Sequence, residues 1–406
     1  MIQIRDYKTD KFKTYIPKDK AKRLCTATDI MIGRYGPPIF QILRGLEGAY
    51  NVALMKAIPN NNIVSNDYLY YLLQDGELLY MLEGLSDRTC GQDGINMYEL
   101  NRYIVGIPPV SEQNRIIEFL SNSISIVNTI ISEKGDLLSI IQLTKSKILD
   151  LAIRGKLVPQ NPNDEPANVL LDRIRAEKQE LIKQGKIKPD KRDSVIFKGE
   201  DNSYYEKIRD DTYCIDDEIP FELPDNWSWC RLQACCIKDI KRGKSPKYAD
   251  NSNTLVFAQK CNTKYDGINL ELSLYLDEST LLKYSEEEYL RDLDIIINST
   301  GTGTLGRVGI YRVADNIREL PIVPDSHVTV IRTYSYIHPE YMYYYLKSIQ
   351  TELEKMGEGS TNQKELKPAT LKELLVPIPS IEEQKRIVEC VKLTFSKLSY
   401  IEHQFN

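Results

Sequence analysis

A long-range duplication constrains the fold of this chain more than any other feature of its sequence. Ile107–Ile117 (IPPVSEQNRII) returns as Ile378–Val388 (IPSIEEQKRIV), 271 residues later. Ahead of it, Asn66–Gln74 (NDYLYYLLQ) matches Pro339–Lys347 (PEYMYYYLK) at a spacing of 273 residues. Solenoid repeats have periods of roughly 20–50 residues, so this spacing indicates two copies of one domain.

Two further matches extend the duplication upstream. Asp29–Ile32 (DIMI) matches Asp294–Ile297 (DIII), and each is followed by a glycine-containing turn. Asn51–Lys56 (NVALMK) matches His327–Arg332 (HVTVIR). Each copy is predicted to contain an apolar strand, a glycine turn, another strand, a Tyr/Leu-rich helix, a Pro-rich hinge and a long helix. We therefore expect an α+β fold with two repeated α/β domains.

The two copies are not equally complete. The second copy opens with Leu223–Leu232 (LPDNWSWCRL). By the spacing between Asp29 and Asp294, the counterpart of this opening would fall about forty residues before Met1. The first copy is therefore expected to lack its own beginning.

Long amphipathic helices are predicted after both hinges. Apolar residues follow a heptad from Ile117 to Ala152, with Lys134 and Lys145 as polar exceptions, and again from Val388 to Phe405. A helix over Ser111–Ile153 would be roughly 65 Å long at 1.5 Å per residue, too long for one small domain to cover. We expect it to pair with the second helix as an antiparallel coiled coil. The alternative is that each helix lies on its own domain.

Three shorter segments complete this outline. Ser380 and Glu383 have the spacing of a capping box at the start of the second long helix. Pro166–Gln184 is predicted as a helix that stops at Gly185. Lys186–Glu218 is charged and has few apolar residues, which predicts a linker.

Composition places the 406-residue chain among soluble proteins of two or three domains, with 42% hydrophobic and 27% charged residues. No apolar run reaches the ~18 residues of a membrane span, and the charged N-terminus lacks the apolar core of a signal peptide. We expect a cytoplasmic protein without a membrane partner. Cys230, Cys235 and Cys236 lie close together, but no second pair follows, so we expect buried thiols and no metal site.

The net charge of −5 alone argues against nucleic acid as a partner, but it hides strong patterning. Met1–Arg23 carries eight Lys/Arg against three Asp, and Lys238–Lys247 carries five Lys/Arg against one Asp. Glu200–Glu218 carries eight acidic residues against two basic ones and dominates the balance. Phosphate affinity depends on local basic patches, so the charge pattern permits DNA binding.

The glycine turn of the second copy resembles a phosphate-binding loop in spacing only. Gly301, Gly303 and Gly306 match G-x-G-x-x-G, but the next residues, RVGIYRV, are strand-like, whereas a nucleotide loop opens a helix. We expect a turn whose backbone approaches a partner closely. The alternative is a well-capped turn without a ligand.

Short hydrogen-bonding side chains and cations surround this turn and the basic segment, and such groups suit phosphates and base edges. Lysines and Arg242 in the basic segment are candidates for phosphates, Arg307 and Gln363 for base edges or nearby backbone, and tyrosines beside basic turns for nucleic-acid contacts. The candidate DNA-binding residues are Lys241, Arg242, Lys244, Lys247, Tyr248, Asn298, Ser299, Thr300, Thr302, Arg307, His327, Gln363 and Lys364, with Arg34, Tyr35 and Gln92 in the first copy.

No motif in the sequence predicts catalysis. An Asn-Pro-Pro-aromatic methyltransferase loop and a Gly-Lys-Ser/Thr P-loop are both absent from the sequence. Its three histidines have no nucleophile or carboxylate at a recognisable spacing. We expect a non-catalytic protein that binds no cofactor itself.

As a set, these segments resemble the specificity subunit of type I restriction–modification systems over the whole chain. The resemblance rests on LPDNWSWCRL, KRGKSPKY, NSTGTGTLGRVGI, IPSIEEQKRIV and the polar linker ILDLAIRGKLVPQNPNDEPANVLLDRIRAEKQELIKQGKIK. It implies two target-recognition domains that each read half of a bipartite site in double-stranded DNA, separated by the helical pair. It also implies methyltransferase subunits docked on the helices and a restriction endonuclease subunit joined through that complex. S-adenosylmethionine, ATP and magnesium would belong to those partners.

On this basis we expect four parts. Residues 1–108 form a partial first target-recognition domain, 109–200 a helical spacer and linker, 201–378 the second target-recognition domain, and 379–406 a short C-terminal spacer helix. The missing opening and the short last helix depart from the family pattern. The alternative functions are a scaffold that binds protein and not DNA, and a silent, truncated specificity cassette.

Overall fold

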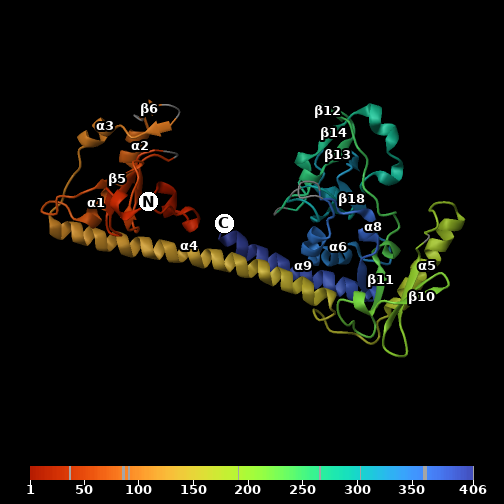
Figure 1. Ribbon diagram of the computed structural model, residues 1–406. Coiled ribbons are helices and arrows are strands. Elements are labelled where there is room, and N and C mark those ends of the chain that lie inside the picture. Colours follow the sequence, from red (N-terminus) through yellow and green to blue (C-terminus); the bar gives the residue numbers. More distant parts are fainter. Residues whose placement is uncertain are drawn as a thin grey trace. The chain divides into compact units, whose positions relative to one another are not determined.

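The computed structural model describes residues 1–35, 38–84, 87–89, 92–190, 192–264, 267–301, 303–359 and 364–405 (Figure 1). The chain forms two compact units, Met1–Gly135 and Asp136–Asn406, and each is treated by itself below. Among the described residues, no helix is long and apolar enough to cross a membrane.

The first unit is built on a small antiparallel sheet whose central strand is completely buried. Its strands, in spatial order, are β3 (Gln41–Leu43), β2 (Ile30–Gly33) and β5 (Leu54–Ala57). Two further antiparallel pairs are β1 (Leu24–Cys25) with β4 (Gly48–Ala49) and β6 (Asp87–Thr89) with β7 (Gln92–Gly94). The helices are α1 (Asn66–Leu72), α2 (Gly76–Gly84) and α3 (Met97–Arg102). Ile32, Phe40, Leu78 and Leu82 share its main core.

The second unit contains a sheet of the same topology together with three further sheets. The matching sheet has the order β16 (Val308–Ile310), β15 (Ile295–Asn298), β18 (Val328–Ile331). Beside it lies the sheet β12 (Tyr248–Ala249), β14 (Leu274–Leu276), β13 (Leu255–Phe257), β17 (Ile322–Pro324). β11 (Ser228–Arg231) pairs with β19 (Leu375–Ile378), and β8 (Ser194–Lys198), β9 (Tyr204–Ile208) and β10 (Asp211–Cys214) form a meander. Its shorter helices are α5 (Ala167–Lys183), α6 (Pro339–Ser348), α7 (Gln350–Lys355) and α8 (Pro368–Lys372).

The duplication predicted from the sequence is confirmed by these two sheets. In each, the central strand follows the matched Asp, and an antiparallel neighbour lies on either side. An equivalent ion pair lies at the same place in both sheets, between the Asp before the central strand and a cation at the end of a neighbouring strand. Lys56 contacts Asp29 at 2.6 Å, and Arg332 contacts Asp294 at 2.6 Å.

The two copies differ in the strand pairing beside the hinge. In the second unit β11 pairs with β19, the strand just before the hinge. Among the described residues of the first unit, no strand pairs with residues 103–109, and Ile104 is 93% exposed. The first copy therefore has no described counterpart of the β11–β19 pair.

Two long helices form the predicted antiparallel coiled coil. α4 spans Val110–Ile153 and α9 spans Ile381–Gln404. Ile148 and Ala152 share a buried cluster with Val388 and neighbouring residues of α9. Further along, Lys145 contacts Glu402 at 2.6 Å, so a predicted polar exception in the heptad is neutralised by the partner helix. Figure 1 shows α9 along the C-terminal part of α4.

Three local predictions need correction. The Tyr/Leu-rich stretch of the second copy, expected as one helix, is divided at Ile349, where ψ is 15°, into α6 and α7. Ser380 caps α9 by accepting from the Glu383 N–H, but the Glu383 carboxylate accepts from the Trp227 indole instead of completing a capping box. The expected linker is wrong for residues 194–214, which form β8, β9 and β10; the helix before it is confirmed as α5.

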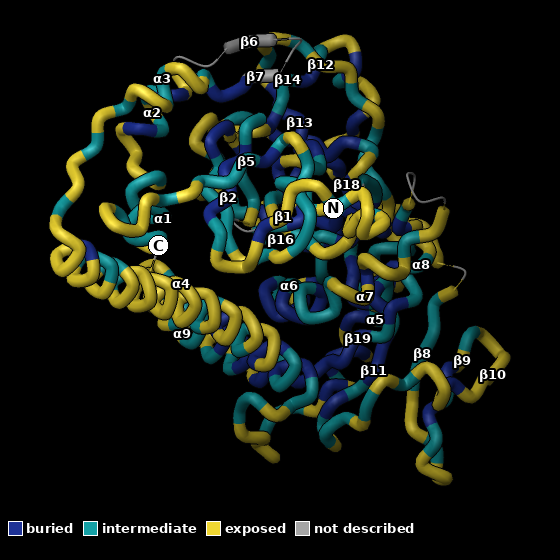
Figure 2. Tube along the Cα trace, turned by 60° about the vertical axis from the view of Figure 1, so that its left-hand side comes forward, coloured by how far each residue is buried: buried dark blue, intermediate teal, exposed yellow. Residues whose placement is uncertain are grey.

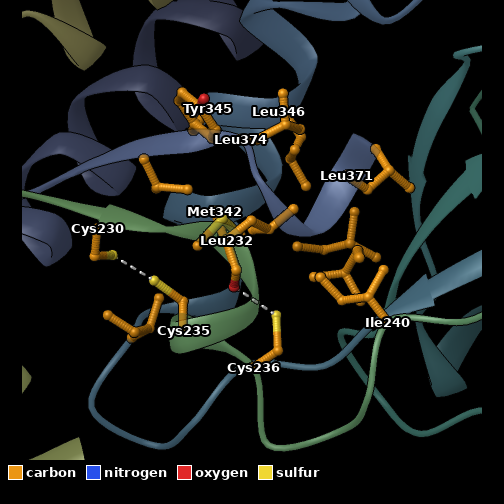
Figure 3. Packing of buried hydrophobic residues seen from close by; sticks show 14 of the residues in the cluster. Cys230, Leu232, Cys235, Cys236, Ile240, Met342, Tyr345, Leu346, Leu371 and Leu374 are labelled. Carbon is orange, nitrogen blue, oxygen red and sulfur yellow. Dashed lines mark hydrogen bonds between the residues drawn. The ribbon is translucent and has the colours of Figure 1, made fainter. Parts of the chain in front are cut away.

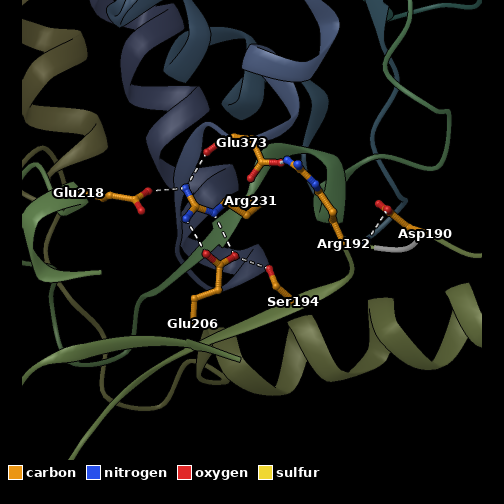
Figure 4. A network of polar contacts seen from close by, with 7 residues as sticks. All are labelled: Asp190, Arg192, Ser194, Glu206, Glu218, Arg231 and Glu373. Atoms are coloured by element: carbon orange, nitrogen blue, oxygen red, sulfur yellow. Dashed lines mark hydrogen bonds and ion pairs between the residues drawn. The ribbon is translucent and has the colours of Figure 1, made fainter. Parts of the chain in front are cut away.

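The meander is held to the second unit by one buried guanidinium (Figure 4). Arg231 on β11 donates to both carboxylate oxygens of Glu206 on β9, at 3.0 and 2.6 Å. It also donates to Glu218 at 2.8 Å and to the main-chain oxygen of Glu373 at 2.7 Å. Few apolar residues are needed in the meander because this network and Trp229 anchor it.

The clustered cysteines are buried, as expected. Cys230, Cys235 and Cys236 are buried in the largest hydrophobic core, against residues such as Met342 and Leu232 (Figure 3). Burial raises the pKa of the Cys236 thiol. No group of three or more His, Cys, Asp or Glu in the described part of the chain is arranged to hold a metal ion. Figure 2 shows this core as the buried interior of the second unit.

Candidate nucleic-acid interface

The basic segment and the glycine turn lie on the same strand although about sixty residues separate them. Gly243 N–H donates to the Val328 oxygen at 3.0 Å, and Ser299 N–H donates to the His327 oxygen at 2.8 Å. Ser299 Oγ also lies 2.7 Å from Thr329 Oγ1. The start of β18 therefore carries both segments, one on each side.

Glycine is required in the basic segment because the backbone approaches β17 closely. A Cβ on Gly243 would collide with the carbonyl oxygens of Pro324 and Asp325. The neighbouring residues Arg242 and Lys244 form β-bridges with Thr329 and Asp325. Only glycine fits here, so the close packing of Gly243 against β17 fixes the positions of Arg242 and Lys244 on the surface.

The glycine turn is a tightly closed loop that leads into a strand. Gly301, Gly303 and Gly306 all have positive φ, at 100°, 77° and 74°. A Cβ on Gly306 would lie 2.6 Å from the Glu354 nitrogen, so a larger residue would displace α7. β16 follows directly, which confirms that the turn does not open a helix in the manner of a nucleotide loop.

The Arg307 side chain turns back onto this loop and holds it by hydrogen bonds to main-chain oxygens. Its guanidinium donates to the Asn262 oxygen at 2.7 Å and to the Gly303 oxygen at 2.9 Å. Asn298 and Ser299 are fully buried, and Asn298 donates to the Gln259 oxygen at 3.1 Å. In this conformation these three predicted contact residues hold the turn in place.

Thr300 and His327 form the accessible part of the turn. Thr300 Oγ1 lies 2.7 Å from His327 Nδ1, and His327 is exposed. Behind them, Asp325 accepts from the His327 N–H at 2.8 Å. Burial raises the pKa of Asp325, although that hydrogen bond opposes the shift. The hydroxyl and imidazole can both donate to and accept from a base edge or phosphate.

Two predicted phosphate-binding lysines share one buried carboxylate. Lys244 Nζ lies 2.7 Å from Glu288, and Lys241 Nζ lies 3.5 Å from its other oxygen. Glu288 is 5% exposed. Burial raises its pKa, but the bond from Lys244 and the Ser285 N–H outweigh burial and leave the pKa below its usual value. The carboxylate is therefore ionised at neutral pH and cancels part of the local positive charge.

The remaining predicted cations differ in whether a carboxylate of the protein already pairs with them. Arg242 contacts Glu365 at 3.0 Å. Lys247, Tyr248 and Lys364 are exposed, and Tyr248 is 49% exposed on β12. No side-chain ion pair involves Lys247 within the described ranges, so its charge is not neutralised by a carboxylate in direct contact.

Lys238, the first residue of the basic segment, lies among strongly charged neighbours. Burial, and next the nearby Arg332, lower the pKa of Lys238 to about 8. Arg332 is itself paired with Asp294, which is 1% exposed. An approaching anion would favour the charged form of Lys238.

In the first unit the predicted residues are fewer. The Arg34 guanidinium lies 5.2 Å from the centre of the Tyr35 ring, and Tyr35 forms a β-bridge with Gly94. Gln92 begins β7. Two predicted contacts, Thr302 and Gln363, lie outside the described residues.

Sequence reasoning missed the residues that organise this surface from a distance. Gln259 accepts from Thr300 and Thr304 at 3.5 and 3.4 Å, although it lies about forty residues upstream. Glu288 gave no signal because it stands in an ordinary acidic run. The Asp–Lys and Asp–Arg pairs were detectable, since the matched segments of the duplication contain them.

A buried glutamine at each hinge was also missed. Gln113 accepts from the Ser65 N–H at 2.9 Å and donates to the Pro108 oxygen at 2.9 Å. Gln384 accepts from the His338 N–H at 2.7 Å and donates to the Pro379 oxygen at 3.1 Å. Both are fully buried. We call this arrangement the hinge glutamine; it fixes each long helix to the start of the Tyr-rich helix of the same copy, α1 or α6.

The fold, the duplication and the coiled coil define a class of protein. Residues 4–138 and 233–404 match the family described as "Type I restriction modification DNA specificity domain". These two stretches are more than half of the chain, and the chain therefore belongs to this family.

Individual specificity subunits are similar to this chain in sequence. The chain is 32% identical to the EcoEI specificity subunit of Escherichia coli over 285 residues, which are 66% of this chain and 40% of that subunit. It is 32% identical to the EcoAI specificity subunit of the same organism over 235 residues, 48% of this chain and 37% of that one. The match thus spans about two fifths of these two relatives. The MjaVIII specificity subunit of Methanocaldococcus jannaschii is 23% identical over 369 residues, 90% of this chain and 71% of that one.

A solved structure supports the fold. A chain from "Structural basis underlying complex assembly and conformational transition of the type I R-M system" superposes with a TM-score of 0.57 and 15% identity. The superposition covers 96% of this chain and 80% of that one.

Proposed function

We propose that this chain is a non-catalytic DNA-reading subunit of a type I restriction–modification complex in the cytoplasm. Its second domain reads one half of a bipartite site in double-stranded DNA through the basic segment and the glycine turn. The first domain reads the other half, and α4 sets the spacing. Methyltransferase subunits dock on the helices, and the endonuclease subunit joins through them.

One observation carries the proposal. Lys241–Lys247 and the turn at residues 299–307 meet on β18, although they are distant in sequence. Cations for phosphates thereby stand next to the half-buried Thr300 hydroxyl and the exposed His327 imidazole, which suit base edges. A protein scaffold would have no use for this combination.

The test measures DNA affinity of the complex with its methyltransferase subunits as a function of salt. Lys247→Ala should weaken binding to all sequences and lower the salt slope by about one unit, since one phosphate contact is lost. Lys244→Ala should act in the same direction. Lys186→Ala, an exposed lysine beyond the end of α5, is the matched control and should change nothing.

A substitution of opposite sign sharpens the test. Glu288→Gln removes the negative charge that neutralises Lys241 and Lys244, so affinity and salt slope should both rise. His327→Ala should instead cost ~1–3 kcal/mol on the cognate site and little elsewhere. No change in affinity or slope for both Lys244→Ala and Glu288→Gln would refute this surface and favour the scaffold.

A further inference from the structure

An exposed ion pair connects the basic segment to the segment between α7 and α8. The Arg242 guanidinium lies 3.0 Å from the Glu365 carboxylate, and the two side chains are 31% and 39% exposed. Glu365 is not among the residues that the sequence predicts to contact DNA. An ion pair at this exposure contributes little to the stability of a fold, because water competes for both charges. Stability therefore does not account for the pair.

The backbone holds both residues beside the glycine turn. Arg242 forms a β-bridge with Thr329 at the start of β18. Glu365 forms one with Thr300 in the turn itself. The Glu365 N–H donates to the Glu358 oxygen at 2.8 Å, and the Glu358 N–H donates back to the Glu365 oxygen at 2.9 Å. The two side chains thus meet from different segments whose backbones are fixed, and such rigid placement is what specific contacts require.

Both charged groups keep free hydrogen-bonding capacity. A guanidinium has five N–H donors in a planar fork, and a carboxylate has about four acceptor sites. Within the described ranges the Arg242 side chain contacts only Glu365, and no hydrogen bond ends on the Glu365 carboxylate. By contrast, the guanidinium groups of Arg231 and Arg307 are occupied by several partners inside the protein. Arg242 and Glu365 can therefore bind a ligand without breaking other contacts.

The carboxylate restricts the part of DNA that this pair can meet. A phosphate that approaches Arg242 also approaches Glu365, and the two negative charges repel each other. The carboxylate of Glu288, which pairs with the neighbouring lysines, is buried instead. In the major groove, the amino groups of cytosine and adenine can donate to a carboxylate. A base edge therefore suits the exposed pair better than a phosphate does.

We propose that Arg242 and Glu365 together read one G·C base pair in the half-site bound by the second domain, an inference that rests on the proposed function. Guanine presents the acceptors N7 and O6 in the major groove, and the N4 amino group of cytosine follows next to O6. The guanidinium donates to both guanine acceptors, and the carboxylate accepts from cytosine N4. An A·T pair would place the adenine amino group against the guanidinium. Glu365 is thus a specificity-determining residue, and Arg242 contacts a base and not a phosphate.

The first experiment selects bound sequences from a random duplex library with the complex of this chain and its methyltransferase subunits. The wild-type complex should enrich a site that contains an invariant G·C pair. Arg242→Ala and Glu365→Ala should each lower discrimination at that same base pair by about ten- to a hundredfold and leave the other positions unchanged. Thermal unfolding checks that both variants remain folded, as expected for an exposed pair.

The second experiment measures affinity for random DNA as a function of salt. Glu365→Ala removes a negative charge, so this affinity should rise although discrimination at the G·C pair is lost. Glu358→Ala is the matched control, because this exposed carboxylate belongs to the backbone partner of Glu365 and pairs with Lys367. It should also raise the affinity for random DNA but should leave every base preference unchanged.

The outcomes separate this inference from the proposed function. A wild-type complex that enriches no sequence would overturn both. A defined wild-type site in which no G·C pair responds to both variants would overturn this inference alone. The same holds if Arg242→Ala weakens binding to all sequences equally and lowers the salt slope by about one unit, since a phosphate contact behaves in this way.

Discussion

Replacing Gln384 by alanine should open the hinge of the second unit locally. The side chain is fully buried and makes two hydrogen bonds to backbone groups, from the His338 N–H and to the Pro379 oxygen. Alanine leaves both backbone groups buried and unpaired, each costing ~1–3 kcal/mol. The loss of packing adds to this, so we expect about 3 kcal/mol in total.

Hydrogen exchange followed by mass spectrometry is the suitable assay, because it reports on each of the two compact units by itself and does not require the chain to unfold in one transition. Exchange should accelerate at the starts of α6 and α9 and remain unchanged in the first unit. Gln113→Ala should produce the mirror result, confined to the first unit. Lys385→Ala, an exposed neighbour on α9, is the control. A loss below about 0.5 kcal/mol, no larger than that of the control, would refute the role of the hinge glutamine.

Three further predictions concern the charged interior and the long helix. Arg231→Met should destabilise the second unit by ~3–5 kcal/mol, because Glu206 stays buried without its partner; denaturant unfolding with and without Glu206→Gln, which should recover part of the loss, measures this. The pKa of Lys238 is lowered from 10.5 to about 8, so between pH 8 and 10.5 the unfolded chain binds more protons than the folded chain. The free energy of unfolding should therefore rise with pH in that window. Lys238→Met should flatten this dependence, as measured by thermal unfolding at several pH values. Inserting seven residues after Gly135 adds ~10.5 Å of helix, or about three base pairs of DNA; methylome mapping should show unchanged half-sites with a wider gap, and new half-sites would contradict the spacer role of α4.

The duplication made most of the fold predictable. Matching segments located both central strands, both hinges and both long helices, because an apolar strand and a heptad seam each leave a periodic signal. The break at Ile349 left no such signal, since apolar spacing continues through it. The β8–β10 meander was missed because a buried salt bridge, Arg231 with Glu206, replaces part of the apolar pattern expected of strands.

The candidate site was predictable in location but not in the role of each side chain. Residue types suited to DNA were identified, yet Asn298, Ser299 and Arg307 turn inward to hold the loop. Burial depends on partners such as Gln259 and Asn262, which the chain brings from elsewhere. The expected domain boundaries remain predictions.

The carboxylate shared by Lys241 and Lys244 has a consequence for target search. A reader of DNA must leave the vast excess of random sequence quickly, and random sequence is held almost entirely by charge. Because Glu288 is ionised and buried beside these lysines, it neutralises part of their positive charge within the protein, whether or not DNA is bound. On the proposed function, this charge pairing would shorten residence on random sequence, while Thr300 and His327 would contact DNA only where the bases fit. An internal counterion would then improve discrimination without touching a base.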